Sequence, residues 1–186
     1  MGQLPKALQF FEIETKLFEE LHRDFPDNVG FKNGLAISYS KLGETHSAMG
    51  QLPKALQFFD LDIELSKELH RDFPDNVGFK NGLAISYEKL GQTHSDLGQL
   101  PKALQFFEER SRLGQELHRD FPDNVGFKNG LAISYVKLGE VAQAAAEKQA
   151  HYRKAEQLWI ELTEAFPEYA QFHQFLGIIR ERLAQF

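Results

Sequence analysis

Apolar residues recur along the chain at helical spacing, in two kinds of segment that alternate. The first kind has one apolar stripe with steps of three and four residues, which predicts a helix buried along one face. This stripe consists of Phe31, Leu35, Tyr39, Leu42, His46 and Met49. The second kind has two neighbouring stripes, which predict a helix buried on two sides. These stripes consist of Leu52, Ala55, Phe59, Ile63 and Ser66, and of Phe58, Leu65, Leu69 and Phe73. We call the first kind an A helix and the second a B helix.

The pair of helices is repeated almost letter for letter. The block ELHRDFPDNVGFKNGLAISY begins at Glu20, Glu68 and Glu116, so the repeat has a period of 48 residues. Such self-similarity at a fixed period is the signature of repeat architectures, in which each unit buries its apolar face against its neighbours. The sequence therefore predicts a stack of helical hairpins.

The joints between the helices have signals of their own. Pro26 ends a B helix, and Asp27 or Asn28 can cap the A helix that follows. Gly50 ends that A helix in a tight turn, and Pro53 lies in the first turn of the next B helix, where its missing N–H costs nothing.

The residues around this turn resemble those of the tetratricopeptide repeat. The family pattern is found here at Tyr39, Leu42, Gly43, His46, Gly50, Ala55, Phe59 and Pro74. The usual unit has about 34 residues, and the extra residues here lengthen each helix by about two turns, which keeps the buried stripe in phase. The resemblance implies an all-α fold of antiparallel helical hairpins stacked as an alpha-alpha superhelix, a TPR-like solenoid. Extended repeats of this kind are similar to those of bacterial proteins.

We expect one repeat domain over residues 1–186. Its parts are a lone B helix at 1–26, repeats at 27–74 and 75–122, a divergent repeat at 123–167 and a capping helix at 168–186. The lone B helix has no A helix before it in this sequence. Its apolar face is therefore expected either to belong to a longer array or to pair with another copy of the chain.

The segment before Pro167 allows two predictions. Between Gly139 and Pro167 there is no Gly or Pro, and the residues are mainly good helix formers. The segment could bend near residues 149–151 and form another hairpin, or continue as one helix that opens the hairpin and exchanges it with a partner. The pattern of Ala155, Trp159 and Pro167 resembles an ordinary B helix and favours the bend.

Composition narrows the classes of partner. The net charge of -6 comes from acids and bases scattered along the chain, without a basic run that could follow a phosphate backbone, so nucleic acid is not expected. The chain has no cysteine, which is compatible with a reducing compartment and a cytoplasmic location. No apolar run approaches the ~20 residues that a membrane span needs, so no membrane partner is expected.

Candidate catalytic and metal-binding groups are sparse. His22, Arg23 and Asp24 resemble the start of a protein kinase catalytic loop, but the other kinase motifs are missing. The acids Asp60 and Asp62 are predicted to be solvated charges on a helix surface. The histidines lie too far apart along the chain to bind one ion by local spacing. We expect neither an enzyme nor a metal or other cofactor.

The resemblance implies that a ligand lies on the concave inner wall, which the A helices form. We predict the peptide-binding residues to be Asn33, Ile37, Ser40, Lys41, Glu44, Asn81, Ile85, Glu88, Lys89, Gln92, Asn129, Ile133, Val136, Lys137 and Glu140. The amides of Asn33, Asn81 and Asn129 each offer a donor and an acceptor that match a peptide backbone. The basic clamp with which some family members hold a terminal carboxylate is not reproduced.

The copies differ in two stretches. On the A helix the differences fall on the predicted inner face, as at Ser40, Glu88 and Val136, and either neutral drift or tuning for a partner explains them. On the B helix they fall at residues 12–19, 60–67 and 108–115, which we predict to form a solvated convex face.

Two functions fit these observations. The first is a non-enzymatic scaffold that binds a peptide or protein segment on the concave A-helix surface. The alternative is a self-associating structural array, a homo-oligomer formed through its unpaired terminal helices.

Overall fold

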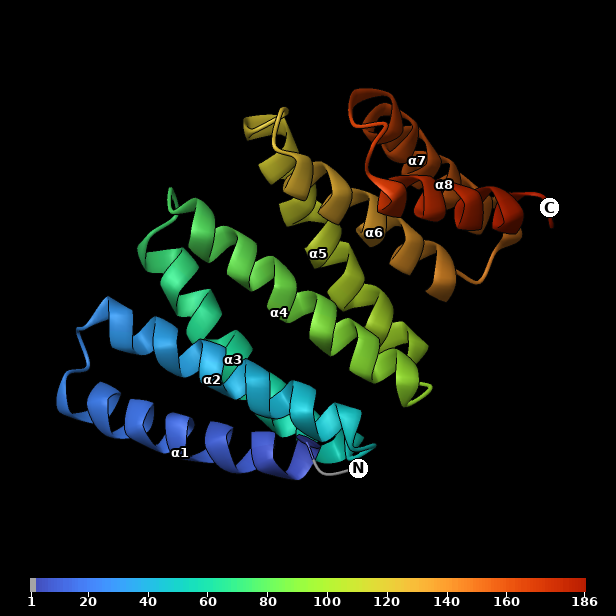
Figure 1. Cartoon of the computed structure of the whole chain (residues 1–186). Coiled ribbons are helices and arrows are strands. Elements are labelled where there is room, and N and C mark those ends of the chain that lie inside the picture. The colour runs from blue at the N-terminus through green and yellow to red at the C-terminus, as the bar shows by residue number, and fades with distance from the viewer. Residues whose placement is uncertain (1–2) are drawn as a thin grey trace. The chain divides into compact units, whose positions relative to one another are not determined.

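The computed structural model describes residues 3–186, and within that range all regular secondary structure is helical (Figure 1). The predicted all-α fold is confirmed. The chain divides into two compact units, Met1–Gln99 and Leu100–Phe186. Unit 1 contains α1 (Gln3–Asp24), α2 (Val29–Ala48), α3 (Leu52–Asp72) and α4 (Val77–Asp96). Unit 2 contains α5 (Leu100–Asp120), α6 (Val125–Val141), α7 (Ala145–Ala165) and α8 (Ala170–Leu183).

Within each unit, consecutive helices pack against one another. Helices α1, α3, α5 and α7 correspond to the B helices of the sequence pattern, and α2, α4, α6 and α8 to the A helices. The division of the chain into repeats at residues 27, 75, 123 and 168 stays a prediction.

The helix ends follow the local sequence. Asn28, Asn76 and Asn124 cap α2, α4 and α6, and the side-chain oxygen of each accepts a hydrogen bond from the backbone N–H three residues later. These bonds satisfy one of the donors that a helix start leaves without a partner. Gly50 has a φ of 73°, a left-handed conformation that a side chain would strain. The tight turn predicted after the first A helix is confirmed.

Close helix packing requires a glycine at two positions of α2. A Cβ atom on Gly43 would collide with the ring of Phe59 from α3, and one on Gly34 would collide with the ring of Phe18 from α1. His46 is buried beside this contact, and its ring stacks on Phe58 with centroids 5.3 Å apart. The histidine at this position is therefore a core ring, as expected.

The break between the last two long helices lies earlier than predicted. Helix α6 ends at Val141, and α7 begins at Ala145 and packs back on α6, so the predicted hairpin is confirmed and the continuous helix is wrong, but the bend does not lie at residues 149–151. The residues around the break are good helix formers, but propensity is a weak force. Tyr152 of α7 packs directly against Gly139 of α6, and this tertiary contact returns the chain onto α6.

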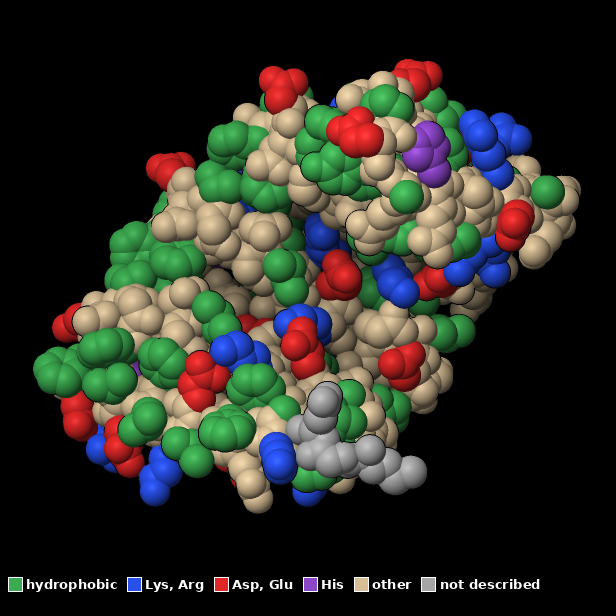
Figure 2. Space-filling view, viewed as in Figure 1, with side chains coloured by type: hydrophobic (Ala, Val, Ile, Leu, Met, Phe, Trp, Pro, Cys, Tyr) green, Lys and Arg blue, Asp and Glu red, His purple; other side chains and the backbone are tan. Residues whose placement is uncertain are grey.

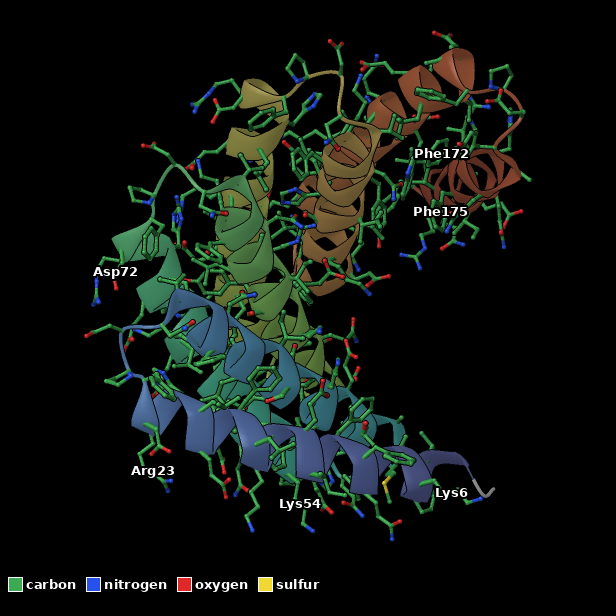
Figure 3. The ribbon with its side chains drawn as sticks, turned by 60° about the vertical axis from the view of Figure 1, so that its left-hand side comes forward. Lys6, Arg23, Lys54, Asp72, Phe172 and Phe175 are labelled. Atoms are coloured by element: carbon green, nitrogen blue, oxygen red, sulfur yellow. The ribbon has the colours of Figure 1, made fainter. Side chains whose placement is uncertain are left out.

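The last helix closes the core of unit 2. Figure 3 shows Phe172 and Phe175 on the side of α8 that faces the rest of the unit. Phe172, Leu176 and Ile179 are buried in one cluster with Trp159 of α7. On the outer side of α8, Arg180 donates a hydrogen bond to Glu156 of α7 over 3.1 Å.

Candidate functional site

Unit 1 has a groove between α2 and α4, with α3 as its floor. Its volume is about 400 Å³. The predicted binding residues that line it are Asn33, Ile37, Ser40, Lys41, Asn81, Ile85 and Lys89. Ile37 on α2 and Ile85 on α4 are 48% and 39% exposed, which leaves apolar surface at the mouth. The groove therefore presents both apolar contacts and amide groups to a ligand.

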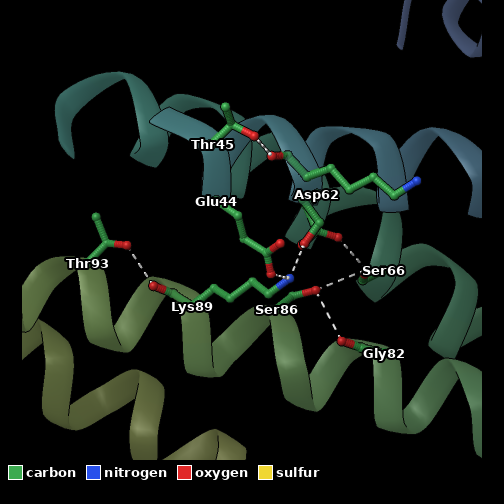
Figure 4. A network of polar contacts seen from close by, with 10 residues as sticks. Glu44, Thr45, Asp62, Ser66, Gly82, Ser86, Lys89 and Thr93 are labelled. Atoms are coloured by element: carbon green, nitrogen blue, oxygen red, sulfur yellow. Dashed lines mark hydrogen bonds and ion pairs between the residues drawn. The ribbon is translucent and has the colours of Figure 1, made fainter. Parts of the chain in front are cut away.

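The floor of this groove is polar and buried. It includes Asp62 and Ser66 of α3, and Asp62 is only 3% exposed. The hydroxyl of Ser66 donates to Asp62 Oδ1 over 3.0 Å, and that of Ser86 on α4 donates to the Gly82 carbonyl over 3.1 Å (Figure 4). The two serine oxygens are 3.3 Å apart. These bonds tie the floor to α4.

One oxygen of Asp62 has no hydrogen-bond partner. Oδ2 is buried and accepts no hydrogen bond from the protein, and the residue lines the groove. Burial raises the pKa of Asp62, while the nearby serine hydroxyls and the charge of Lys89 act in the opposite direction. A buried acceptor without a partner costs about 1–3 kcal/mol. Oδ2 of Asp62 is thus a buried acceptor of the groove that could take a further donor.

The two lysines of the groove are engaged with neighbouring acids. Lys89 Nζ donates to Ser40 Oγ over 2.7 Å and forms an ion pair with Glu44 of α2 (Figure 4). Lys41 Nζ forms an ion pair with Glu14 of α1 at 3.1 Å. Ser40 is itself buried, so it contributes to the groove through this contact and not as an open polar surface.

Other predicted residues of unit 1 lie beside the groove. The Gln92 side chain donates to Asp96 on the next turn of α4 over 2.7 Å. Glu88, also on α4, is half-buried and does not line the groove.

Unit 2 has a corresponding groove between α6 and α8, with α7 as its floor. Its volume is about 280 Å³, and it is almost wholly apolar. Its lining consists of Ile133, Val136, Trp159, Phe175, Ile178, Ile179 and Arg182. Of these, Ile133 and Val136 belong to the predicted binding residues.

The remaining predicted residues of unit 2 are held by contacts of their own. The Asn129 oxygen accepts a hydrogen bond from the Trp159 indole over 2.9 Å, so Asn129 supports the core and differs from Asn33 and Asn81. Lys137 pairs with Glu140, and Glu140 also pairs with Arg182 of α8 at 2.8 Å. Burial by itself would raise the pKa of Glu140. The hydrogen bonds and charges of Lys137 and Arg182 outweigh this effect and hold the pKa below its ordinary value.

The two grooves occupy matching positions in the repeat. If Ala55 is aligned with Ala155, Asp62 of α3 corresponds to Leu162 of α7. If Pro74 is aligned with Pro167, four groove residues of α4 correspond to four of α8. These pairs are Gly82 and Phe175, Ile85 and Ile178, Ser86 and Ile179, and Lys89 and Arg182. The outer ion pair is kept in both grooves, while the inner polar groups of unit 1 are replaced by apolar ones in unit 2.

Asp62 is the charged groove residue that sequence reasoning missed, together with the lining residues Ala36, Ser66, Gly78, Phe79, Gly82 and Ser86. We predicted a solvated acid on a convex face, and this is wrong because Asp62, Ile63 and Ser66 are all buried. The spacing contained the signal: Asp62 lies three residues after Phe59 and four before Ser66, on the buried side of the helix. Arg110, at the same position of α5, is buried too and donates to the Gly130 carbonyl of α6.

The described helices offer little other chemistry. Within the range that the structure describes, no three His, Cys, Asp or Glu side chains gather as a metal site would require. None of these helices is long and apolar enough to span a membrane.

Comparison with known protein families gives a match over one part of the chain. Residues 35–75 match the family model of the tetratricopeptide repeat. No curated protein matches the sequence significantly.

Solved structures with a similar course of the chain come from several bacteria. A thermophilic TPR protein of Thermus thermophilus is 19% identical with a TM-score of 0.47, over 80% of this chain and 66% of that one, so the chain spans just under two thirds of its length. BtubC of P. vanneervenii is 15% identical with a TM-score of 0.48, over 100% and 91% of the two chains. A TPR repeats protein of Bacteroides fragilis is 14% identical with a TM-score of 0.36, over 97% and 98%.

Proposed function

We propose that the chain is built of tetratricopeptide repeats, of which residues 35–75 match the family model, and that it is a non-enzymatic scaffold that binds an extended polypeptide segment along the groove of unit 1. The observation that supports this most is the combination of exposed Ile37 and Ile85 at the mouth with a polar floor beneath them. Binding sites combine apolar walls with a few placed polar groups that fix the ligand's orientation.

The amides of the groove suit a polypeptide backbone. Asn33 on α2 and Asn81 on α4 both line it. Each can donate to a carbonyl and accept from an N–H, the two groups that every residue of an extended segment repeats except proline. Side chains of the segment would contact Ile37 and Ile85. The other predicted residues, Glu44, Glu88 and Gln92 among them, would form the rim.

This function can be tested with a random-peptide display library selected on the purified chain. Enriched peptides would be synthesised, and their affinity measured by fluorescence anisotropy for the unchanged chain and for I85E. We expect at least about tenfold weaker binding to the variant, because a charge would face the apolar contact. The matched control is I178E in the corresponding groove of unit 2, which should leave the affinity unchanged. Enrichment of no peptide, or equal binding to I85E, would refute the proposal.

Self-association is a second candidate, and the outer face of α1 favours it. Phe10, Ile13 and Leu17 are 71%, 60% and 54% exposed and lie on one stripe of the helix. Figure 2 shows apolar side chains gathered along α1 at the lower left. In α3 the residue that corresponds to Phe10 is Phe58, which packs on the His46 ring of α2. At Phe10 the face of α1 thus corresponds to one that an A helix covers in α3, whereas Leu61, the counterpart of Ile13, is 40% exposed.

Light scattering over a range of concentrations tests this second function. We expect a concentration-dependent dimer or larger species, and we expect F10E with L17E to abolish it without lowering the melting temperature, since both side chains are exposed. Unchanged association in this variant would remove α1 as the interface. A monomer at every concentration would remove self-association altogether.

A further inference from the structure

We propose that the groove of unit 1 is a receptor for a basic side chain, lysine or arginine, whose charged head pairs with Asp62 on the groove floor. This inference rests on the proposed function, because it names the chemistry of the segment that the groove takes. A basic side chain bound at Asp62 would make the groove selective for cationic segments. This selectivity is opposite to that of a basic clamp, which binds a carboxylate.

The first support is the state of the Asp62 carboxyl group. Only 3% of the surface of Asp62 is exposed to solvent, and the residue lines the groove. Oδ1 accepts from Ser66, but Oδ2 has no hydrogen-bond donor. Buried polar atoms in native structures nearly always have a partner, so a vacant acceptor at the bottom of a groove points to a donor brought by a ligand.

The second support is the balance of charge. Asp62 and Glu44 contribute two negative charges, and Lys89 contributes one positive charge between α2 and α4. Lys41 is paired with Glu14 of α1 at 3.1 Å and does not change the sum. One negative charge therefore remains uncompensated when Asp62 is ionised. A cation on the ligand would neutralise it beside a carboxyl group that is only 3% exposed, where the attraction is stronger than at the surface.

The third support is that packing does not require an acid here. The corresponding residue of unit 2 is Leu162, which is buried in an apolar core. The fold therefore accepts an apolar side chain at this position, and the acid of unit 1 carries a desolvation cost that leucine avoids.

The walls of the groove suit the stem of a basic side chain. Ile37 and Ile85 flank the mouth above Asp62, so the methylene groups of lysine or arginine would contact them. Arginine fits best, because its guanidinium is weakly hydrated and carries five donors in one plane. These donors can reach Oδ2 of Asp62 together with nearby hydroxyl oxygens.

The probe for this site is N-acetyl-arginine amide, with N-acetyl-citrulline amide as the matched control. The two differ in charge but hardly in shape. Nuclear magnetic resonance would follow the carboxyl carbon of Asp62 in the unchanged chain, and the backbone amide signals of Ser66 and Ser86 in every variant, while each probe is titrated into the whole chain. We expect the arginine probe alone to shift this signal, and its affinity to fall about tenfold or more in D62N, since a charge-assisted hydrogen bond is lost.

A second variant distinguishes a loss of binding from a loss of folding in D62N. D62L copies the residue that unit 2 already tolerates, and it should also lose the arginine probe while keeping its helical circular dichroism. Equal shifts with both probes, or no shift with either, would overturn the inference. The proposed function and the role of Asp62 can fail independently. If peptides without a basic residue bind the unchanged chain but not I85E, the proposed function stands and the role of Asp62 is refuted.

Discussion

The grooves of unit 1 and unit 2 are formed by corresponding helices of the repeat but differ in what lines them. In unit 1 the floor has Asp62 and Ser66, and Gly82 leaves open space beside them. In unit 2 the corresponding residues are Leu162 of α7, Phe166 just after α7 and Phe175 of α8, of which Phe175 lines a groove that is smaller and apolar. The comparison teaches that the repeat determines where a groove forms, while a few B-helix and A-helix positions determine its chemistry.

The same B-helix position differs in every copy. It is Glu14 in α1, Asp62 in α3, Arg110 in α5 and Leu162 in α7. Glu14 pairs with Lys41, Arg110 donates to the Gly130 carbonyl, and Leu162 joins an apolar cluster. Each of these three side chains has its contact within its own unit. Of the four residues at this position, Asp62 is the one with a buried side-chain oxygen that has no hydrogen-bond partner.

The largest expected effect is the loss of the apolar floor in unit 2. W159A removes a side chain that is 4% exposed and also the hydrogen bond to Asn129, so we expect the free energy of unfolding to fall by about 3–5 kcal/mol. Urea unfolding followed by circular dichroism measures it. I178A, which truncates an exposed residue of the same groove, is the control and should cost far less. A loss below about 1 kcal/mol for W159A would show that the floor is not core.

Two copies of one glycine should respond in opposite directions. G34A places a methyl group against the Phe18 ring and should destabilise by about 1–3 kcal/mol, because the packed ring must move. G82A meets no atom within 4 Å and should stabilise by up to about 1 kcal/mol through helix propensity. Thermal unfolding of the two variants gives the comparison. Destabilisation by G82A would mean that the groove of unit 1 is not open at this point.

Replacing the acid of unit 1 by the leucine of unit 2 should stabilise the chain. D62L removes a buried acceptor without a partner, and we expect a gain of about 1–2 kcal/mol at neutral pH. Because the folded-state pKa of Asp62 is raised, the unchanged chain loses stability as pH rises from the unfolded pKa through the folded one. The gain from D62L should therefore shrink in acid, and urea unfolding at several pH values would show it. A gain that does not vary with pH would mean that Asp62 does not titrate differently in the folded state.

The smallest effect is expected at the outer ion pair of unit 2. E140Q should cost at most about 1 kcal/mol, since both partners remain partly exposed to solvent. The folded-state pKa of Glu140 is lowered, so its contribution is present above the unfolded pKa and is lost as pH falls. The two chains should converge in stability in acid and in high salt. K89M, which leaves Asp62 and Glu44 without their cation, is the counterpart in unit 1 and should cost more.

Much of the fold could be predicted from the sequence because its determinants are local. The cap at Asn28, the turn at Gly50 and the packing of His46 and Phe58 follow from residue types and spacing that recur with the repeat. The break between α6 and α7 could not be predicted, because Ala142 and its neighbours carry no stop signal and only the contact of Tyr152 with Gly139 decides where the chain turns.

The site divides in the same way. Asn33, Ile37, Asn81 and Ile85 could be named from the face of the A helix that they share. Asp62 and Trp159 could not, because each belongs to a B helix that forms the floor only after two A helices have packed over it.

Residue types and their spacing were sufficient to predict the helices, their caps, their pairing order and the 48-residue period, since these depend on neighbours within a turn or two and on letter-for-letter repetition. That the B-helix position of Asp62 lies inside a groove, and that the copies of this position have different surroundings, became visible only from the packing of the helices. The physical reason is that burial depends on what packs over a side chain, and identical helix patterns place different residues under that cover.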